Sequence, residues 1–387
     1  MSLSPDVARM KRELADLVAI DTQNPPGDEA RAAQFLHELL MTGGFEVALQ
    51  EYKPTRINVV ARLENGAGPV FAFNTHMDVV PAGDGWSSDP FVLKEANGRL
   101  YGRGACDCKG PLAAMLEAMR MLAAERAAWS GTLLGVFVAD EEIASEGAKF
   151  YASTGPKIDA AIIGEPTSNA TFTAHKGSLR PVVRVRGVSA HSGTPHLGEN
   201  AIYRAGELLG LVAEHHEKVV RHRTHPLVGA ASLTVTRMNG GHADNVLPGA
   251  CDLLLDRRMV PGEDEEAVKC EIGDLLVLAR ERLGVRAEIV DYKATTGGAT
   301  ETALDTPIVQ ASLAASRAHG VVKPGPFGFQ GGCDLVHFRK LGAQGTVIGP
   351  GDLAVAHKPD EFVPVDEFVA SSLIYRDVAK AMLRNGG

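Results

Sequence analysis

The chain has 387 residues, of which 45% are hydrophobic and 22% charged, as in an ordinary soluble globular protein. This length exceeds what one hydrophobic core usually serves, so we expect two domains. The formal net charge of -9 and the lack of any basic run argue against nucleic acid or an anionic membrane as a partner. The longest apolar runs are far shorter than the roughly 20 residues of a membrane span.

The cysteines and the first residues indicate a compartment. Five cysteines spread over a long chain suit a reducing environment better than a disulfide framework. Residues 1–11 lack the apolar segment of a signal peptide. We therefore expect a cytoplasmic protein. Cys106 and Cys108 are separated by one residue instead of the two typical of a redox or zinc pair, so they predict no metal site.

Helices alternate with buried strands in the first part of the chain. Apolar residues at helical spacing predict helices over residues 6–20, 28–42 and 108–128. Short apolar runs predict strands over residues 46–51, 57–63, 70–75, 131–139 and 158–163. This alternation is typical of an α/β domain with a mostly parallel sheet flanked by helices.

The pattern changes at Gly177, where strands with one polar face begin. Such strands are predicted over residues 179–188, 233–238, 251–257 and 286–291, and helices over 199–220 and 263–283. Together they predict an α+β layer with two helices on one face of an antiparallel sheet. The first pattern then returns, with helices over 306–319, 334–341 and 365–382 and a strand over 345–348. We predict a discontinuous domain, 1–177 and 293–387, interrupted by a domain over 178–292.

Residues that can bind a metal follow several apolar strands of the first domain. His76 follows one strand, Glu141 and Glu142 another, and Glu165 a third, while His357 comes a short loop after the fourth. If these strands are parallel, their ends meet at one edge of the sheet, where ligands usually bind. Two imidazoles and several carboxylates suit a hydrolytic zinc pair with open positions better than a closed structural site.

Each of these residues also has an ordinary structural interpretation. Glu141 and Glu142 together resemble a solvated acidic turn. Asp107 stands just before a predicted helix and could be its N-cap. His357 could be a plain loop residue. Only the convergence of all of them favours a metal site.

Ordered motifs along nearly the whole chain extend this pattern. They are NTHMDVVP at 74–81, GWSSDPF at 85–91, YGRGACDCKG at 101–110, DEE at 140–142, GEPT at 164–167, HKGS at 175–178, SAHSGTPHLGENA at 189–201, DNVLPG at 244–249 and AHKPDE at 356–361. In these motifs the chain resembles the M20 metallopeptidases, the group of acetylornithine deacetylase, succinyl-diaminopimelate desuccinylase, aminoacylase and carboxypeptidase G2.

The resemblance implies a metal centre with two Zn²⁺ per chain, for which Co²⁺ or Mn²⁺ could substitute. Asp107 would bridge the two ions. His76 and Glu165 would complete the protein ligands of one ion, and Glu142 and His357 those of the other. A cis peptide bond after Asp107 is also implied.

The resemblance also implies the acid–base residues. Glu141 would be the general base, taking a proton from the attacking water and later returning it to the leaving amine. Asp78 would hold the second ring nitrogen of His76 and so set its tautomer.

The domain over 178–292 resembles the dimerisation or lid domain of the family, which implies a homodimer. There His191 would reach into the partner's site and stabilise the oxyanion. Asn245 and Arg258 would hold the substrate carboxylate, although a surface ion pair with Asp256 or Glu263 is an equally open interpretation of Arg258. Lys176, Gly331 and Gly332 complete the implied substrate contacts.

Some positions depart from the family pattern near the expected substrate. Lys176 stands where the desuccinylases have Arg, Cys333 replaces a common Thr or Ser, and Cys108 is an unusual neighbour of the bridging Asp107. We therefore expect an amidohydrolase that cleaves an N-acyl amino acid, and leave open a dipeptidase or carboxypeptidase. A catalytically silent binding homologue is a third alternative, which the intact ligand set and Glu141 disfavour.

Overall fold

The computed structural model describes residues 3–383, and its contacts divide the chain into two compact units. The first unit comprises the chain up to Thr173, then Glu301–Gly328, and then Cys333 onward. The second comprises Ala174–Thr300 and Phe329–Gly332. The expected boundaries lay at 177/178 and 292/293, and the outer limits 1 and 387 of the expected first domain lie outside the described residues.

The first unit is built on a nine-stranded sheet whose strand order is β1-β2-β6-β3-β7-β17-β8-β15, with β16 paired to β8. The strands β6, β3, β7 and β17 are mutually parallel, and β1 and β2 are antiparallel additions at one edge. Their bounds are Glu46–Lys53 for β1, Arg56–Asn65 for β2, Val70–His76 for β3, Gly131–Val138 for β6, Ala160–Ile163 for β7 and Gln344–Val347 for β17. The expected parallel arrangement of the four metal-associated strands is confirmed.

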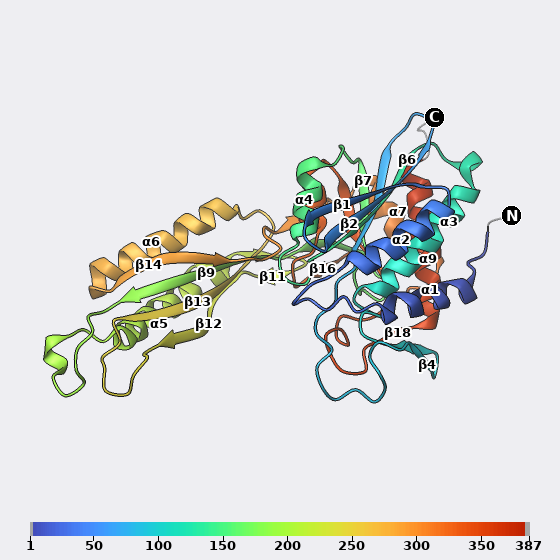
Figure 1. Ribbon diagram of the computed structural model, residues 1–387. Coiled ribbons are helices and arrows are strands. Elements are labelled where there is room, and N and C mark those ends of the chain that lie inside the picture. Colours follow the sequence, from blue (N-terminus) through green and yellow to red (C-terminus); the bar gives the residue numbers. More distant parts are fainter. Residues whose placement is uncertain (1–2, 384–387) are drawn as a thin grey trace. The chain divides into compact units, whose positions relative to one another are not determined.

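Helices cover both faces of this sheet (Figure 1). The helices of one group contribute to a single hydrophobic core, in which the side chains of α3 are almost all buried. A smaller pair, α4 and α8, packs together through the rings of Tyr151 and Phe338. The first group is α1 (Val7–Ala19), α2 (Ala30–Thr42), α3 (Lys109–Ala124), α7 (Pro307–Ala318) and α9 (Val365–Met382). The second is α4 (Glu146–Thr154) and α8 (Leu335–Lys340).

Alternation along the strands explains why both faces need cover. Phe71 and Phe73 of β3 point into the core shared with α3 and α9, whereas the intervening Ala72 is equally buried but lies outside that core. Successive side chains of a strand point to opposite faces, so a strand with no exposed position must be covered twice.

Short elements complete the first unit. A three-stranded sheet pairs β4 (Lys94–Ala96) with β5 (Arg99–Tyr101), and β5 with β18 (Phe362–Pro364). The short strands at the far end of the central sheet are β8 (Phe172–His175), β15 (Thr300–Glu301) and β16 (Phe327–Phe329), and η1 (Arg126–Ala128) is a 3₁₀ turn. The sequence did not predict the three-stranded sheet, because strands of three residues carry almost no periodic signal.

The second unit is a four-stranded antiparallel sheet in the order β12-β13-β9-β14, covered by α5 and α6. The α+β layer expected here is therefore present. The bounds are β9 Gly177–Arg186, β12 Ser232–Gly240, β13 Ala250–Met259, β14 Arg286–Lys293, α5 Ala201–Lys218 and α6 Glu265–Leu283, with short segments β10 Thr224–His225, β11 Gly229–Ala230, η2 Pro195–Leu197 and η3 Val220–His222. Within residues 3–383, no helix is both long and apolar enough to cross a bilayer.

Candidate metal centre and active site

The expected metal-binding residues of the first unit meet at one edge of its sheet. His76 is the last residue of β3, Glu141 and Glu142 follow β6, and Glu165 follows β7. His357 comes from the loop after β17. Because these strands are parallel, their carboxyl ends lie side by side.

Two groups of ligand atoms share one residue, Asp107. In the first group, His76 Nε2 lies 3.3 Å from Asp107 Oδ1, and Glu165 contributes a carboxylate. In the second, His357 Nε2 lies 3.1 Å from Asp107 Oδ2 and 3.1 Å from Glu142 Oε2. Each oxygen of Asp107 therefore faces a different imidazole, as a bridging carboxylate must.

The N-cap interpretation of Asp107 is wrong. Helix α3 begins at Lys109 with Cys108 as its N-cap, and no side chain makes a capping hydrogen bond to the helix. Asp107 instead points its carboxylate at the two imidazoles. The peptide bond between Asp107 and Cys108 is cis, as the family resemblance implied.

The ring of His76 is oriented by Asp78, but through the backbone. Nδ1 of His76 lies 2.9 Å from the carbonyl oxygen of Asp78 and 3.6 Å from its carboxylate Oδ1. The carbonyl can only accept, so Nδ1 carries the proton and Nε2 presents its lone pair to the metal group. Nδ1 of His76 was expected to bond to the carboxylate of Asp78, but its hydrogen bond goes to the backbone carbonyl of that residue.

The carboxylate of Asp78 instead holds the turn that carries Glu141 and Glu142. It accepts hydrogen bonds from the backbone N–H of Glu141 at 3.1 Å and of Glu142 at 3.3 Å. Asn24 donates to it at 2.8 Å and also to Asp140 at 2.9 Å. Burial works to raise the pKa of Asp78, but these bonds and His76 outweigh it and lower the pKa.

A buried ion network supports this turn from behind. Arg56 pairs with Asp140, and its other amino group lies 3.0 Å from Glu29. Burial raises the pKa of Glu29 to about 8. Asn24 and Glu29 belong to no motif that the sequence analysis singled out, so their role follows only from the structure.

The carboxylates of the cluster are crowded. Burial raises the pKa of Glu141 well above its ordinary value, and the charge of Glu165 adds to this shift. Burial likewise raises the pKa of Glu142, with Asp107 as the next cause. The nearby Asp107 and Glu142 carboxylates raise the pKa of His357 to about 10. Cations bound among these carboxylates would relieve their repulsion, and the donor set of imidazole and carboxylate suits zinc or manganese.

Glu361 fixes the backbone that carries Asp107, a contact that the sequence analysis missed. It is buried, and its Oε1 accepts hydrogen bonds from the N–H of Cys106 at 2.9 Å and of Asp107 at 3.0 Å. Its other oxygen pairs with Arg103. Burial, followed by the charge of Asp107, raises the pKa of Glu361 to about 7. The residue stands at the end of the AHKPDE motif, the one signal that could have indicated it.

We expect Glu361→Gln to weaken metal binding about 10- to 100-fold, the usual effect of losing a group that orients a ligand. The amide must turn its NH₂ either toward the two backbone N–H groups or toward Arg103, and either choice sets donor against donor. Zinc competition titration measures the effect. Glu95→Gln on β4, where Glu95 is exposed, is the control, and an unchanged zinc affinity in Glu361→Gln would contradict the assigned role.

His191 and Asn245 lie together in the second unit, on exposed loops. The backbone of His191 forms an isolated antiparallel β-bridge with Val246. The N–H of Ser192 donates a hydrogen bond to the carbonyl oxygen of Asn245 at 2.9 Å. The N–H of Gly193 donates to His191 Nδ1 at 3.0 Å. Nδ1 is therefore an acceptor, and Nε2 of the neutral ring carries the proton that an oxyanion would need.

The other expected substrate residues also belong to the second unit. Arg258 makes an ion pair with Asp256 at 2.7 Å, as the surface-ion-pair interpretation of this residue expected. Lys176 Nζ donates a hydrogen bond to the carbonyl oxygen of Ala230 at 2.9 Å. Gly331 and Gly332 belong to the short segment Phe329–Gly332. The substrate roles of these residues stay predictions.

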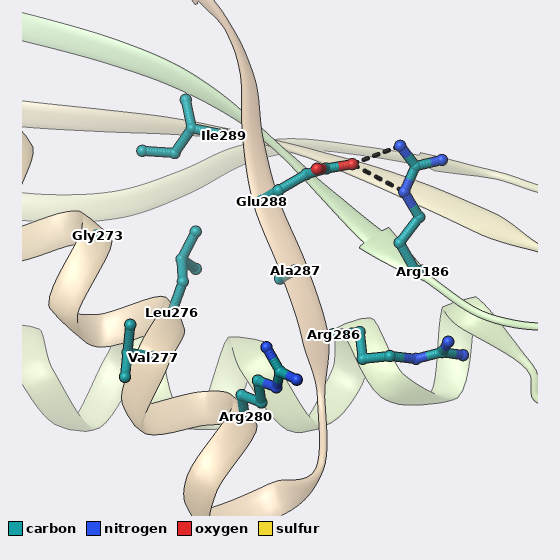
Figure 2. A pocket seen from close by; sticks show the side chains of 9 residues that line it. All are labelled: Arg186, Gly273, Leu276, Val277, Arg280, Arg286, Ala287, Glu288 and Ile289. Carbon is teal, nitrogen blue, oxygen red and sulfur yellow. Dashed lines mark hydrogen bonds and ion pairs between the residues drawn. The ribbon is translucent and has the colours of Figure 1, made fainter.

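The second unit also has a depression of about 460 Å³ between α6 and β14 (Figure 2). Leu276 and Ile289 contribute apolar side chains, and Arg186 at its rim pairs with Glu288. No residue that the sequence analysis proposed as catalytic, metal-binding or substrate-binding lines it.

Residues 72–381 match the sequence pattern of peptidase family M20/M25/M40. The chain belongs to this family. Two relatives show how far the similarity extends. An acetylornithine deacetylase from Myxococcus xanthus is 33% identical, covering 97% of this chain and 98% of the relative. A probable succinyl-diaminopimelate desuccinylase from Staphylococcus epidermidis is 32% identical, covering 96% and 97%. The M20 chain is accordingly a hydrolase of amide or peptide bonds.

Solved structures share the fold at lower identity. A tripeptidase from Staphylococcus aureus matches with a TM-score of 0.79 at 20% identity, covering 98% of this chain and all of the other. A dinuclear metal-binding M20 peptidase from Bacillus subtilis matches with a TM-score of 0.74 at 17% identity, covering 97% and 98%. At such identities these matches support the fold alone.

Proposed function

We propose that this M20 hydrolase removes the acyl group from an N-acyl amino acid, with two zinc ions held by His76, Asp107, Glu142, Glu165 and His357. The observation that carries the proposal is Asp107, whose two carboxylate oxygens each face one of two ligand groups. The full-length similarity to a deacetylase and a desuccinylase supports the deacylase class. We also propose a cytoplasmic location, which the five free cysteines support because they suit a reducing compartment.

The residues of the first unit divide the chemistry between them. When bound, the zinc pair would polarise the amide carbonyl and make an attacking water more acidic. Glu141 would accept the proton of that water and return it to the leaving amine. Asp78 would keep Glu141 in place through the N–H groups of the turn.

A panel of N-acetyl, N-succinyl and dipeptide substrates with the zinc-loaded protein tests this function. The expected result is a kcat/KM at least about tenfold higher for one acylated amino acid than for any dipeptide, a difference of about 1.4 kcal/mol in transition-state binding. If the protein instead prefers dipeptides, it is a peptidase that uses the same metal chemistry. No hydrolysis of any substrate would remove the catalytic proposal.

We further propose that the chain works as a homodimer through its second unit, with His191 acting in the partner's site. The exposed ring of His191 and its protonated Nε2 support this role. We expect His191→Ala and Glu141→Gln chains to be nearly inactive alone and to regain up to about a quarter of the activity when mixed, because one mixed site in each heterodimer then has both residues.

The mixing experiment has a matched control within the same chain. His196→Ala, in the neighbouring exposed turn η2, should leave activity close to that of the unaltered protein. Light scattering reports whether the chains associate. A dimer that recovers no activity on mixing would instead place the complete site within one chain.

A further inference from the structure

The sulfur of Cys108 lies inside the first group of metal-ligating atoms. It is one of four, with atoms of His76, Asp107 and Glu165, that all lie within 4.8 Å of one another. Cys108 is completely buried, so its thiol faces this group and not solvent. Its Sγ lies 2.9 Å from Asp107 Oδ1 and 3.5 Å from Glu165 Oε2.

The spacing of these atoms is close to that of ligands around one zinc ion. Usual zinc–ligand bond lengths in a tetrahedron place sulfur and oxygen about 3.6 Å apart and nitrogen and oxygen about 3.4 Å apart. The corresponding distances here are 3.5 Å from Cys108 Sγ to Glu165 Oε2 and 3.3 Å from His76 Nε2 to Asp107 Oδ1. The shorter 2.9 Å contact with Asp107 is a hydrogen bond of the protonated thiol, which ends when a metal takes the place of the proton.

We propose that Cys108 supplies a thiolate ligand to the metal held by His76, Asp107 and Glu165. The inference rests on the metal centre of the proposed function. On binding, the thiol proton is released to solvent and a sulfur–metal bond forms. No thiolate was expected among the ligands, because the single residue between Cys106 and Cys108 does not match the spacing of a metal-binding cysteine pair. Cys108 joins the metal group through its neighbour Asp107 and not through Cys106.

The thiolate makes the two metal positions unequal. The first position would then have four protein ligands, whereas Asp107, Glu142 and His357 give the second three. Zinc can expand to five ligands, so both positions could still take part in the reaction. A sulfur ligand also favours soft ions, so the first position should prefer Cd²⁺ over Mn²⁺ more strongly than nitrogen and oxygen ligands alone would.

Absorption spectroscopy of the Co²⁺-loaded protein tests the ligand directly. We expect a near-ultraviolet sulfur-to-cobalt charge-transfer band, its loss in Cys108→Ser, and about 10- to 100-fold weaker binding of Cd²⁺ to that variant with little change for Mn²⁺. Cys106→Ser is the matched control. Cys106 is equally buried, but its sulfur faces the carbonyl of Asp352 at 3.6 Å, so the band should remain.

X-ray absorption of the unaltered, zinc-loaded protein gives the same answer without a variant. A zinc–sulfur distance near roughly 2.3 Å supports the proposal. Bound zinc with only nitrogen and oxygen neighbours would overturn the sulfur ligand and leave the metal centre standing. A protein that binds no metal would overturn both.

Discussion

Glu141→Gln is expected to retain both metals and to lose activity by about 10²- to 10⁴-fold, the usual contribution of a general base. The substitution keeps the size of the side chain. It also keeps the backbone N–H of residue 141, which donates a hydrogen bond to Asp78, so the turn with Glu142 stays in place. It removes only the carboxylate that can take a proton. The measurement is kcat/KM on the best acylated substrate, together with metal content per chain.

The control for this substitution is Glu146→Gln, five residues further on. Glu146 begins α4 and makes a partly exposed ion pair with Lys149 at 3.4 Å. Exposed pairs of this kind contribute little stability, so turnover should be near normal. Near-normal turnover of Glu141→Gln itself would remove Glu141 as the base, and lost metal would show that its effect is structural.

The meeting of the candidate metal-binding residues at one edge of the sheet could be predicted because it depends on short-range patterns. An apolar run that ends in a His or Glu marks a strand end, and parallel strands bring such ends together without any knowledge of side-chain contacts. His76 and Glu165 are placed by this argument alone, since β3 and β7 are adjacent and parallel. Helix α9 could be predicted equally directly, because its apolar residues recur at helical spacing from Val365 to Met382.

The residues that hold the ligands in place could not be predicted in this way. Glu361 reaches Asp107 across 254 positions, and Asn24 reaches Asp78 across 54. No local periodicity encodes a hydrogen bond between segments so far apart. The same limit explains Asp107, whose neighbours in sequence suggest a helix cap while its partners in space are His76 and His357.

Asp107 allows the sharpest test of the shared ligand. We expect Asp107→Asn to lower the affinity of both metal positions by more than about 100-fold, beyond the effect of losing an orienting group. The amide is neutral and has one oxygen instead of two, so it cannot serve both His76 and His357. His357→Ala, in contrast, should weaken only the second position, and His76→Ala only the first, because each imidazole faces one oxygen of Asp107.

Metal analysis after zinc loading distinguishes these outcomes. The unaltered chain should hold two zinc ions, either histidine variant about one, and Asp107→Asn fewer than one, while Asp84→Asn on an exposed loop should match the unaltered chain. Circular dichroism verifies that each variant is folded. If folded Asp107→Asn kept one full zinc while losing the other, Asp107 would belong to a single metal position, and the two groups that share it in this structure would be independent sites.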